Sequence, residues 1–281
     1  MRQFRPGGFS LLPPAVKNLL IINGLFFLAT IALEQAFGIS LYRVFGLHFF
    51  GATDFAPYQF VTYLFMHGGF THLFFNMFAL WMFGNILENV WGPKRFLIYY
   101  FVTGFGAAII HYIVVYYQLM PTLNAVDAFL ADPSHDALKY FIESDVFQVA
   151  SYQIQTNLRT FLQDYNAMMA DDPQGALVRA VNFMHQYRVD LLNAPVVVGA
   201  SGAVFGILLA FGMLFPNSLI YLFFAIPIKA KYFVMIYGGL ELYFGMANRA
   251  GDNVAHFAHL GGMIFGFFLI RYWNKKGKNF Y

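Results

Sequence analysis

The chain has 281 residues, of which 59% are hydrophobic, 20% aromatic and only 11% charged, and its formal net charge is +3. About a quarter of the residues in a soluble domain are charged, so this composition excludes an ordinary soluble protein and does not suggest a nucleic-acid-binding one. The absence of cysteine excludes disulfides and thiolate metal sites.

Hydrophobic stretches of about 20 residues recur along the sequence and predict membrane-spanning helices. The first is basic on its N-terminal side and is followed by no small-residue cleavage site, so it is interpreted as a retained signal anchor. The expected fold is an all-α polytopic membrane protein with a tail over 1–15, spans one to three within 16–117, spans four to six within 194–274, and a basic tail over 275–281. The six spans are expected over about 16–37, 71–91, 96–117, 201–215, 231–246 and 255–273.

Residues 118–193 differ in composition from the spans on either side. They include nine acidic and four basic residues, a net charge of −5. Stretches over 136–148 and 150–169 have amphipathic patterns, and Asp172-Pro173 is typical of a helix start. We therefore expect a water-exposed helical insertion between spans three and four.

Basic residues are distributed unequally between the two sides of the six expected spans. Eleven lysines and arginines lie on the side that holds both termini, and six lie on the other side, in longer loops. The positive-inside rule then places both termini in the cytoplasm and makes the insertion extracytoplasmic. We expect a multi-pass protein of the plasma (inner) membrane of a prokaryote.

Polar side chains gather at the outer ends of spans two, four and six. His72 and Asn76 share one face of span two, Ser201 begins span four, and His256 and His259 lie near the start of span six. Polar groups at membrane depth usually face the protein interior or a water-filled cavity, and the free N–H groups of a helix start can bind an oxyanion. The pattern indicates one shared site in which an imidazole reaches a serine hydroxyl.

Glycines surround the serine and recur in span six. Gly199 allows a sharp turn, and the spacings of Gly202 with Gly206 and of Gly262 with Gly266 predict that spans four and six pack closely. Taken alone, the serine segment leaves an alternative open. It could be a small-residue packing seam in which the serine is bonded to its own helix.

In their order along the chain, these motifs resemble the rhomboid family of intramembrane serine proteases. The resemblance lies within about 55–117 and 194–273 and implies a six-helix bundle with a Ser–His dyad that needs no cofactor or metal. It implies that Ser201 is the nucleophile and His259 the general base, and that His72, Asn76 and the Ser201 backbone N–H stabilise the oxyanion. The implied substrates are transmembrane helices of other proteins in the lipid bilayer. The matching motifs are His72-x-x-x-Asn76, Gly199-Ala200-Ser201-Gly202 and Ala258-His259-x-x-Gly262-x-x-x-Gly266.

Two positions depart from the family pattern. Phe205 stands one helical turn after the serine, where the family often has a tyrosine, so ring stacking on the imidazole is kept and the hydroxyl is lost. Tyr58-Gln59 stands where many members have a Trp-Arg pair, which leaves the role of this loop open.

Two other functions compete with proteolysis. Asp252, His256 and His259 could form the metal-binding face of a membrane metalloenzyme, although the chain lacks the His-Glu-x-x-His motif of zinc proteases. The second alternative is a transporter or a non-proteolytic binder of transmembrane segments. Glu241, in span five, is interpreted as a helix cap or a bridge between spans.

Overall fold

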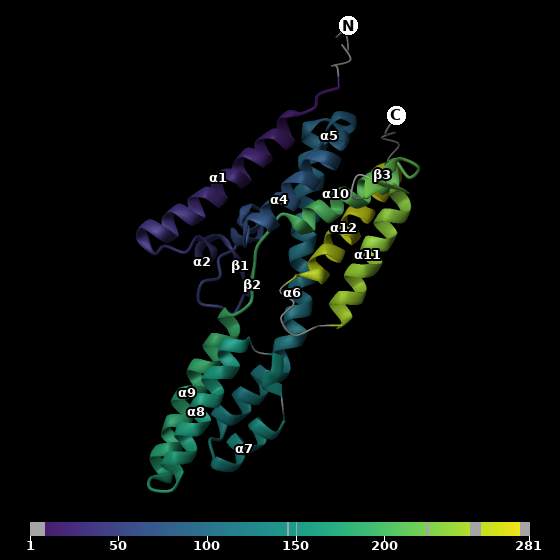
Figure 1. Ribbon diagram of the computed structural model, residues 1–281. Coiled ribbons are helices and arrows are strands. Elements are labelled where there is room, and N and C mark those ends of the chain that lie inside the picture. Colours follow the sequence, from purple (N-terminus) through teal and green to yellow (C-terminus); the bar gives the residue numbers. More distant parts are fainter. Residues whose placement is uncertain (1–8, 145, 150, 223–224, 248–253, 276–281) are drawn as a thin grey trace. The chain divides into compact units, whose positions relative to one another are not determined.

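The computed structural model describes residues 9–144, 146–149, 151–222, 225–247 and 254–275, and most of these are helical (Figure 1). The chain divides into two compact units. The first unit contains residues 1–47, 57–111 and 197–281, and the second contains residues 48–56 and 112–196. The boundary falls inside the long helix α6 (Pro93–Ala131), so one continuous helix contributes to both units.

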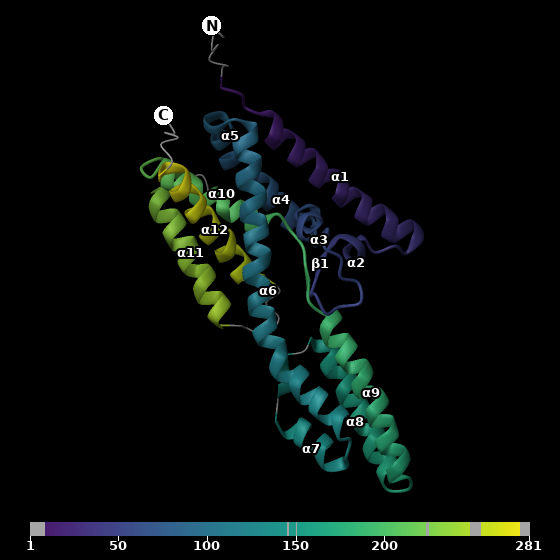
Figure 2. The ribbon, with the colours of Figure 1, turned by 180° about the vertical axis from the view of Figure 1, so that it is seen from behind.

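The first unit holds most of the helices. In Figures 1 and 2, α10, α11 and α12 lie side by side, and together they carry the polar residues discussed below. Besides the start of α6, the helices of this unit are α1 (Pro14–Phe37), α2 (Leu41–Phe45), α3 (Gln59–Thr62), the 3-10 helix η1 (Tyr63–Phe65), α4 (Phe70–Ala79), the π-helix η2 (Leu80–Gly84), α5 (Asn85–Trp91), α10 (Ser201–Leu214), α11 (Ala230–Ala247) and α12 (His256–Lys275).

Both ends of helix α1 are capped by specific residues. Its first backbone N–H groups have no partner inside the helix, and Glu88 accepts hydrogen bonds from two of them, those of Ala15 and Val16, at 2.8 and 2.7 Å. A carboxylate at this end also interacts favourably with the helix dipole. Gly38 ends the helix in the left-handed conformation, at φ 66°, and its N–H donates to Glu34. The buried Glu88 therefore fixes where the first expected span begins.

Within the part of the chain that the structure describes, three helical segments are long and apolar enough to cross a membrane: Pro14–Phe37, Phe70–Trp91 and Pro93–Ala131. They coincide with the first three expected spans, although the third continues well past the expected end at residue 117. Helix α10 is apolar but shorter, with 14 residues. The mostly helical fold with several apolar spans is therefore confirmed, and the count of six spans stays a prediction.

Short strands appear where the sequence suggested only connections. Between α10 and α11, β3 (Leu219–Leu222) pairs antiparallel with β4 (Ile226–Lys229) in a hairpin. Two further strands, β1 (Leu47–His48) and β2 (Val196–Val197), pair with each other, and each contains a point where the chain passes between the units.

The second unit is a helical bundle with a core of its own. Its remaining elements are α7 (His135–Glu143), the 3-10 helix η3 (Val146–Val149), α8 (Tyr152–Met169) and α9 (Pro173–Asn193). Each α-helix begins with a side-chain cap: Ser134, Ser151 and Asp172 accept hydrogen bonds from backbone N–H groups three residues later. The helices bury apolar side chains that include Phe129, Phe141, Leu158, Phe161, Met184 and Tyr187.

The amphipathic helices expected in this part of the chain are present with small shifts in their ends. The helix expected over 136–148 ends at Glu143, and the one expected over 150–169 begins at Tyr152. The compact unit itself is larger than the expected insertion over 118–193, because it begins at Tyr112 and takes in residues 48–56.

Candidate active site

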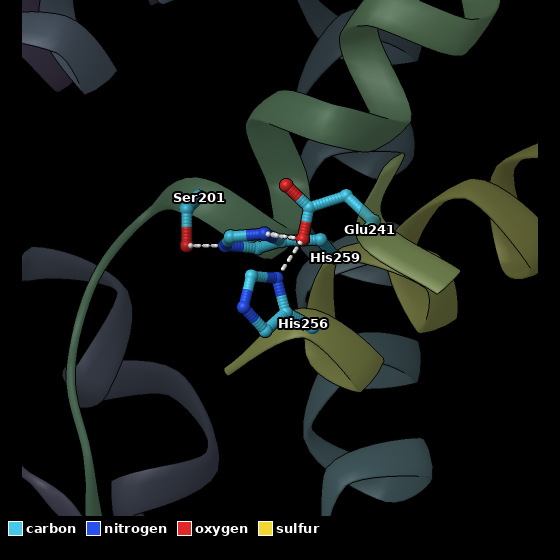
Figure 3. A network of polar contacts seen from close by, with 4 residues as sticks. All are labelled: Ser201, Glu241, His256 and His259. Atoms are coloured by element: carbon cyan, nitrogen blue, oxygen red, sulfur yellow. Dashed lines mark hydrogen bonds and ion pairs between the residues drawn. The ribbon is translucent and has the colours of Figure 1, made fainter. Parts of the chain in front are cut away.

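Four polar side chains from three helices form a continuous hydrogen-bonded chain in the first unit, as Figure 3 shows. The Oγ atom of Ser201 in α10 lies 2.8 Å from Nε2 of His259 in α12. On the other side of that ring, Nδ1 lies 2.8 Å from Oε2 of Glu241 in α11. The same carboxylate oxygen is 2.6 Å from Nδ1 of His256, at the first position of α12. The histidine and the serine that the sequence predicts to meet are thus within hydrogen-bonding distance.

The backbone just before Ser201 is held in a conformation that favours glycine. Gly199 has φ 124°, and its N–H donates to the carbonyl of Tyr63 at 2.9 Å. Ser201 is the first residue of α10, and the residue before it, Ala200, supplies no side-chain cap. The N–H groups of this first turn therefore point out of the helix without a capping side chain, as an oxyanion site requires.

The distance between serine and histidine depends on glycines in the two facing helices. A Cβ on Gly262 would overlap with the carbonyl oxygen of Gly202, and a Cβ on Gly202 would overlap with Ala107 of α6. Such contacts bring the backbones of α10 and α12 closer than larger residues would allow. The predicted close packing of these helices is therefore present.

The second pair of glycines meets helix α6 one turn further along. A Cβ on Gly206 would lie 2.6 Å from the side chain of Thr103, and a Cβ on Gly266 would overlap with the Tyr99 hydroxyl. That hydroxyl donates a hydrogen bond to the carbonyl of Gly206 at 2.8 Å. Helices α6, α10 and α12 are therefore in close contact one turn further along α10 from the serine.

Phe205 lies directly under the imidazole. The rings of Phe205 and His259 are stacked, with centroids 4.2 Å apart and an angle of 6° between their planes. The stacking expected from the sequence is therefore found, and it restricts the tilt of the histidine ring. The His259 side chain is only 10% exposed, and Phe205 is partly buried.

His72 and Asn76 lie on α4, beside the turn that precedes the serine. A Cβ on Gly199 would lie 2.8 Å from both Nε2 and Cε1 of His72, so this imidazole packs against the glycine turn. Asn76 is buried, and its amide donates to the carbonyl of His72 at 2.9 Å. The structure brings His72 to the turn before the serine and leaves the Asn76 amide bonded to its own helix.

A further histidine, which the sequence analysis did not single out, adjoins this group. His67 is buried before α4, and its ring makes an edge contact with His72 at a centroid distance of 5.1 Å. Burial, and to a smaller extent the neighbouring His72, lower the pKa of His67 to about 4. His67 is therefore uncharged at neutral pH, which suits a packing partner for His72.

Among the described residues, one group has the ligand atoms to hold a metal ion, namely Glu241, His256 and His259, whose ligand atoms lie within 4.8 Å of one another. Asp252, the third member of the metal face considered from the sequence, lies outside the described residues. Both Nδ1 atoms already contact one carboxylate oxygen. A metal ion bound there would have to replace both hydrogen bonds.

The bridging interpretation of Glu241 agrees with the structure, because its carboxylate joins α11 to α12. The sequence analysis did not assign Glu241 to the site, and it gave His256 a place near the site but no role in the dyad. The available signal was an acidic side chain in an otherwise apolar helix, where a charge is costly unless it has partners.

The comparisons with known proteins point in the same direction as the geometry. The family profile of the Rhomboid domain matches residues 54–123 and 174–275, which together make up more than half of the chain. The match contains all the site residues described above. No curated protein matches the chain.

Substitution of Gly262 by alanine tests the helix contact. Gly262→Ala should lower the unfolding temperature and reduce any hydrolytic activity at least tenfold, because α10 and α12 must move apart; overpacking of this kind costs about 1–3 kcal/mol. Gly239→Ala is the matched control, since a Cβ there meets nothing within 4 Å. The measurements are thermal unfolding in detergent and labelling of Ser201 by a fluorophosphonate. Wild-type values for Gly262→Ala would contradict the close-packing argument.

Proposed function

Because the chain belongs to the rhomboid family of intramembrane serine proteases, we propose that it hydrolyses peptide bonds in or near transmembrane helices of other membrane proteins. Ser201 is the nucleophile and His259 the general base. The observation that carries this proposal is the 2.8 Å separation of Oγ and Nε2. A nucleophile and a base at this distance, with the base oriented by a third group, form the arrangement that activates serine in acyl transfer.

The proposed reaction has two stages. As Ser201 Oγ attacks the scissile carbonyl carbon, Nε2 of His259 takes the hydroxyl proton. It then gives that proton to the leaving nitrogen, and the C–N bond breaks to leave an acyl-enzyme. Water next attacks the ester carbonyl and gives a proton to Nε2. The bond to Oγ breaks, the new carboxyl end leaves, and the proton returns to the serine.

The negative charge on the carbonyl oxygen in each stage needs hydrogen-bond donors. We assign this role to the backbone N–H of Ser201, which lies at the uncapped start of α10, together with His72 and Asn76. Support for His72 comes from its contact with Gly199, two residues before the nucleophile. Asn76 could contribute if its amide exchanged its bond to the His72 carbonyl for one to the oxyanion.

The proposed membrane arrangement has six spans with both termini in the cytoplasm of a prokaryotic cell. The three long apolar helices and the shorter α10 supply four of them, and α11 and α12, with 18 and 20 residues, supply the others. The unequal distribution of lysine and arginine supports this orientation. In this orientation α7, α8 and α9 are extracytoplasmic, and the site lies at the outer ends of spans two, four and six.

Removal of either member of the dyad should abolish proteolysis. Ser201→Ala and His259→Ala are each expected to reduce cleavage of a model transmembrane substrate by at least about 10³-fold, because loss of one member of such a unit costs several orders of magnitude. Ser218→Ala and His185→Ala, at exposed positions, serve as controls and should keep full activity. Cleavage is measured with purified protein in proteoliposomes.

The same assay separates the competing functions. Full activity of Ser201→Ala, or inhibition of the wild type by a chelator, would favour the metalloenzyme. Failure of the wild type to cut any substrate or react with a fluorophosphonate would favour a non-proteolytic binder of transmembrane segments.

Loss of an oxyanion donor should affect the chemical step more than substrate binding. His72→Ala and Asn76→Ala are each expected to lower kcat by about 10²–10³-fold. KM should change little, since the donor acts mainly in the transition state. Steady-state kinetics with a fluorogenic transmembrane peptide make the comparison. If both variants have the wild-type kcat, neither side chain stabilises the oxyanion.

The orientation can be tested with single cysteines because the chain has none of its own. Lys139→Cys and Gln174→Cys lie on exposed surface of the second unit and should react with a membrane-impermeant maleimide in intact cells. Asn279→Cys, in the basic tail, should react only after the cells are permeabilised. The reverse pattern of labelling would place the second unit in the cytoplasm and invert the proposed topology.

A further inference from the structure

Helix α11 carries one acidic side chain, Glu241, in a sequence that is otherwise apolar over most of its length. The side chain is only 12% exposed. A carboxylate removed from water costs several kcal/mol unless it is paired and hydrogen-bonded. Among the described residues, the two imidazoles of α12 supply this compensation, as Figure 3 shows, so Glu241 and these histidines form one electrostatic unit.

The position of the carboxylate determines which nitrogen of His259 carries the proton. An ionised carboxylate can only accept hydrogen bonds, so the Nδ1 atom that lies 2.8 Å from Oε2 must donate. In neutral imidazole the other nitrogen is then an acceptor. That nitrogen, Nε2, lies 2.8 Å from Ser201 Oγ and has its lone pair available for the hydroxyl proton.

We propose that Glu241 is a positioning residue that completes a Ser201–His259–Glu241 triad. The inference rests on the proposed function and extends it, since the family resemblance implies a dyad without an acidic member. Glu241 holds His259 in the tautomer and orientation of a general base, and its negative charge stabilises the imidazolium that forms when the serine proton is taken. It keeps its own charge throughout, and no proton passes to it.

His256 fixes the carboxylate in turn. Its Nδ1 donates to the same oxygen, Oε2, at 2.6 Å, and its ring stands nearly perpendicular to that of His259, at 85°. A carboxylate whose one oxygen accepts hydrogen bonds from two N–H groups at these distances has little freedom to rotate. With Phe205 stacked below the imidazole and Glu241 bonded to its edge, the ring of the proposed base is restrained in both tilt and rotation.

The competing explanation is that Glu241 only ties α11 to α12. Both explanations predict some loss of stability when the carboxylate is removed, so stability alone does not separate them. They differ in kinetics. A positioning role predicts a fall in kcat that depends on the acceptor charge and on the presence of His259, whereas a purely structural tie predicts changes that follow the folded fraction.

The decisive variants are Glu241→Gln and Glu241→Asp. Glutamine has nearly the same shape, but it can turn its amide N–H₂ group toward Nδ1, which would move the imidazole proton to Nε2 and block the base. The equivalent change in a serine-protease triad lowers kcat about 10⁴-fold. We expect Glu241→Gln to lower kcat by about 10²–10⁴-fold with KM within about threefold of wild type. Glu241→Asp, which restores the charge, should recover at least about tenfold of the loss.

A control and a double variant complete the experiment. Glu34→Gln, at an exposed position in α1, removes a similar charge away from the site and should leave kcat unchanged. In a His259→Ala background, Glu241→Gln should cause no further loss in the rate of fluorophosphonate labelling, because the residue acts through that ring. Unfolding temperatures measured in parallel correct every rate for the folded fraction.

The outcomes separate this inference from the proposed function. If Ser201→Ala is inactive but Glu241→Gln keeps the wild-type kcat, the triad is wrong and the dyad stands. A loss in Glu241→Gln that matches its folded fraction, with no recovery in Glu241→Asp, also overturns the positioning role. If Ser201→Ala is fully active, the proposed function itself fails, whatever the Glu241 variants do.

Discussion

The site depends on how closely two helices approach each other. Gly202 in α10 and Gly262 in α12 leave so little room that a single methyl group at position 262 would overlap with the opposite backbone. The serine side chain is short, so it reaches Nε2 of His259 only when the helices are this close. Lipid does not drive apolar helices together, and close packing of small residues is a main source of their association. The same glycines therefore stabilise the bundle and set the distance between the reacting groups.

Glu88 and Glu241 are two carboxylates of the first unit that are largely removed from water and that have different roles. Glu88 accepts hydrogen bonds from backbone N–H groups at the start of α1. These N–H groups do not titrate and do not react. Glu241 accepts hydrogen bonds from two imidazoles, and one of these imidazoles contacts a serine hydroxyl. Each pairing offsets the cost of burying a charge. Only at Glu241 does the partner take part in proton transfer, so only there can the buried charge influence chemistry.

The sequence predicts the contact between the serine and the histidine, but it does not predict which acidic residue joins them. Motif order and helix spacing predict that Ser201 meets His259, the family resemblance implies that Phe205 stacks on the imidazole, and the structure has both contacts. Glu241 could not be assigned in the same way, because it lies 18 residues from His259 on another helix. No periodic pattern fixes the relative rotation of two helices. The hairpin of β3 and β4 was missed for a related reason, since strands of four residues are too short for alternation to stand out from an aromatic run.

The second unit shows why a long interruption leaves the site intact. The chain leaves the first unit within α6 and returns at Val197, just before the turn at Gly199, while the family profile is silent between residues 123 and 174. The cost of closing a loop rises only slowly with its length, so many inserted residues need cost little if they fold by themselves. This unit has features that favour such folding, because α7, α8 and α9 are each capped and share a core that includes Phe141 and Tyr187. The glycine contacts and hydrogen bonds that hold the serine next to the histidine all come from the first unit.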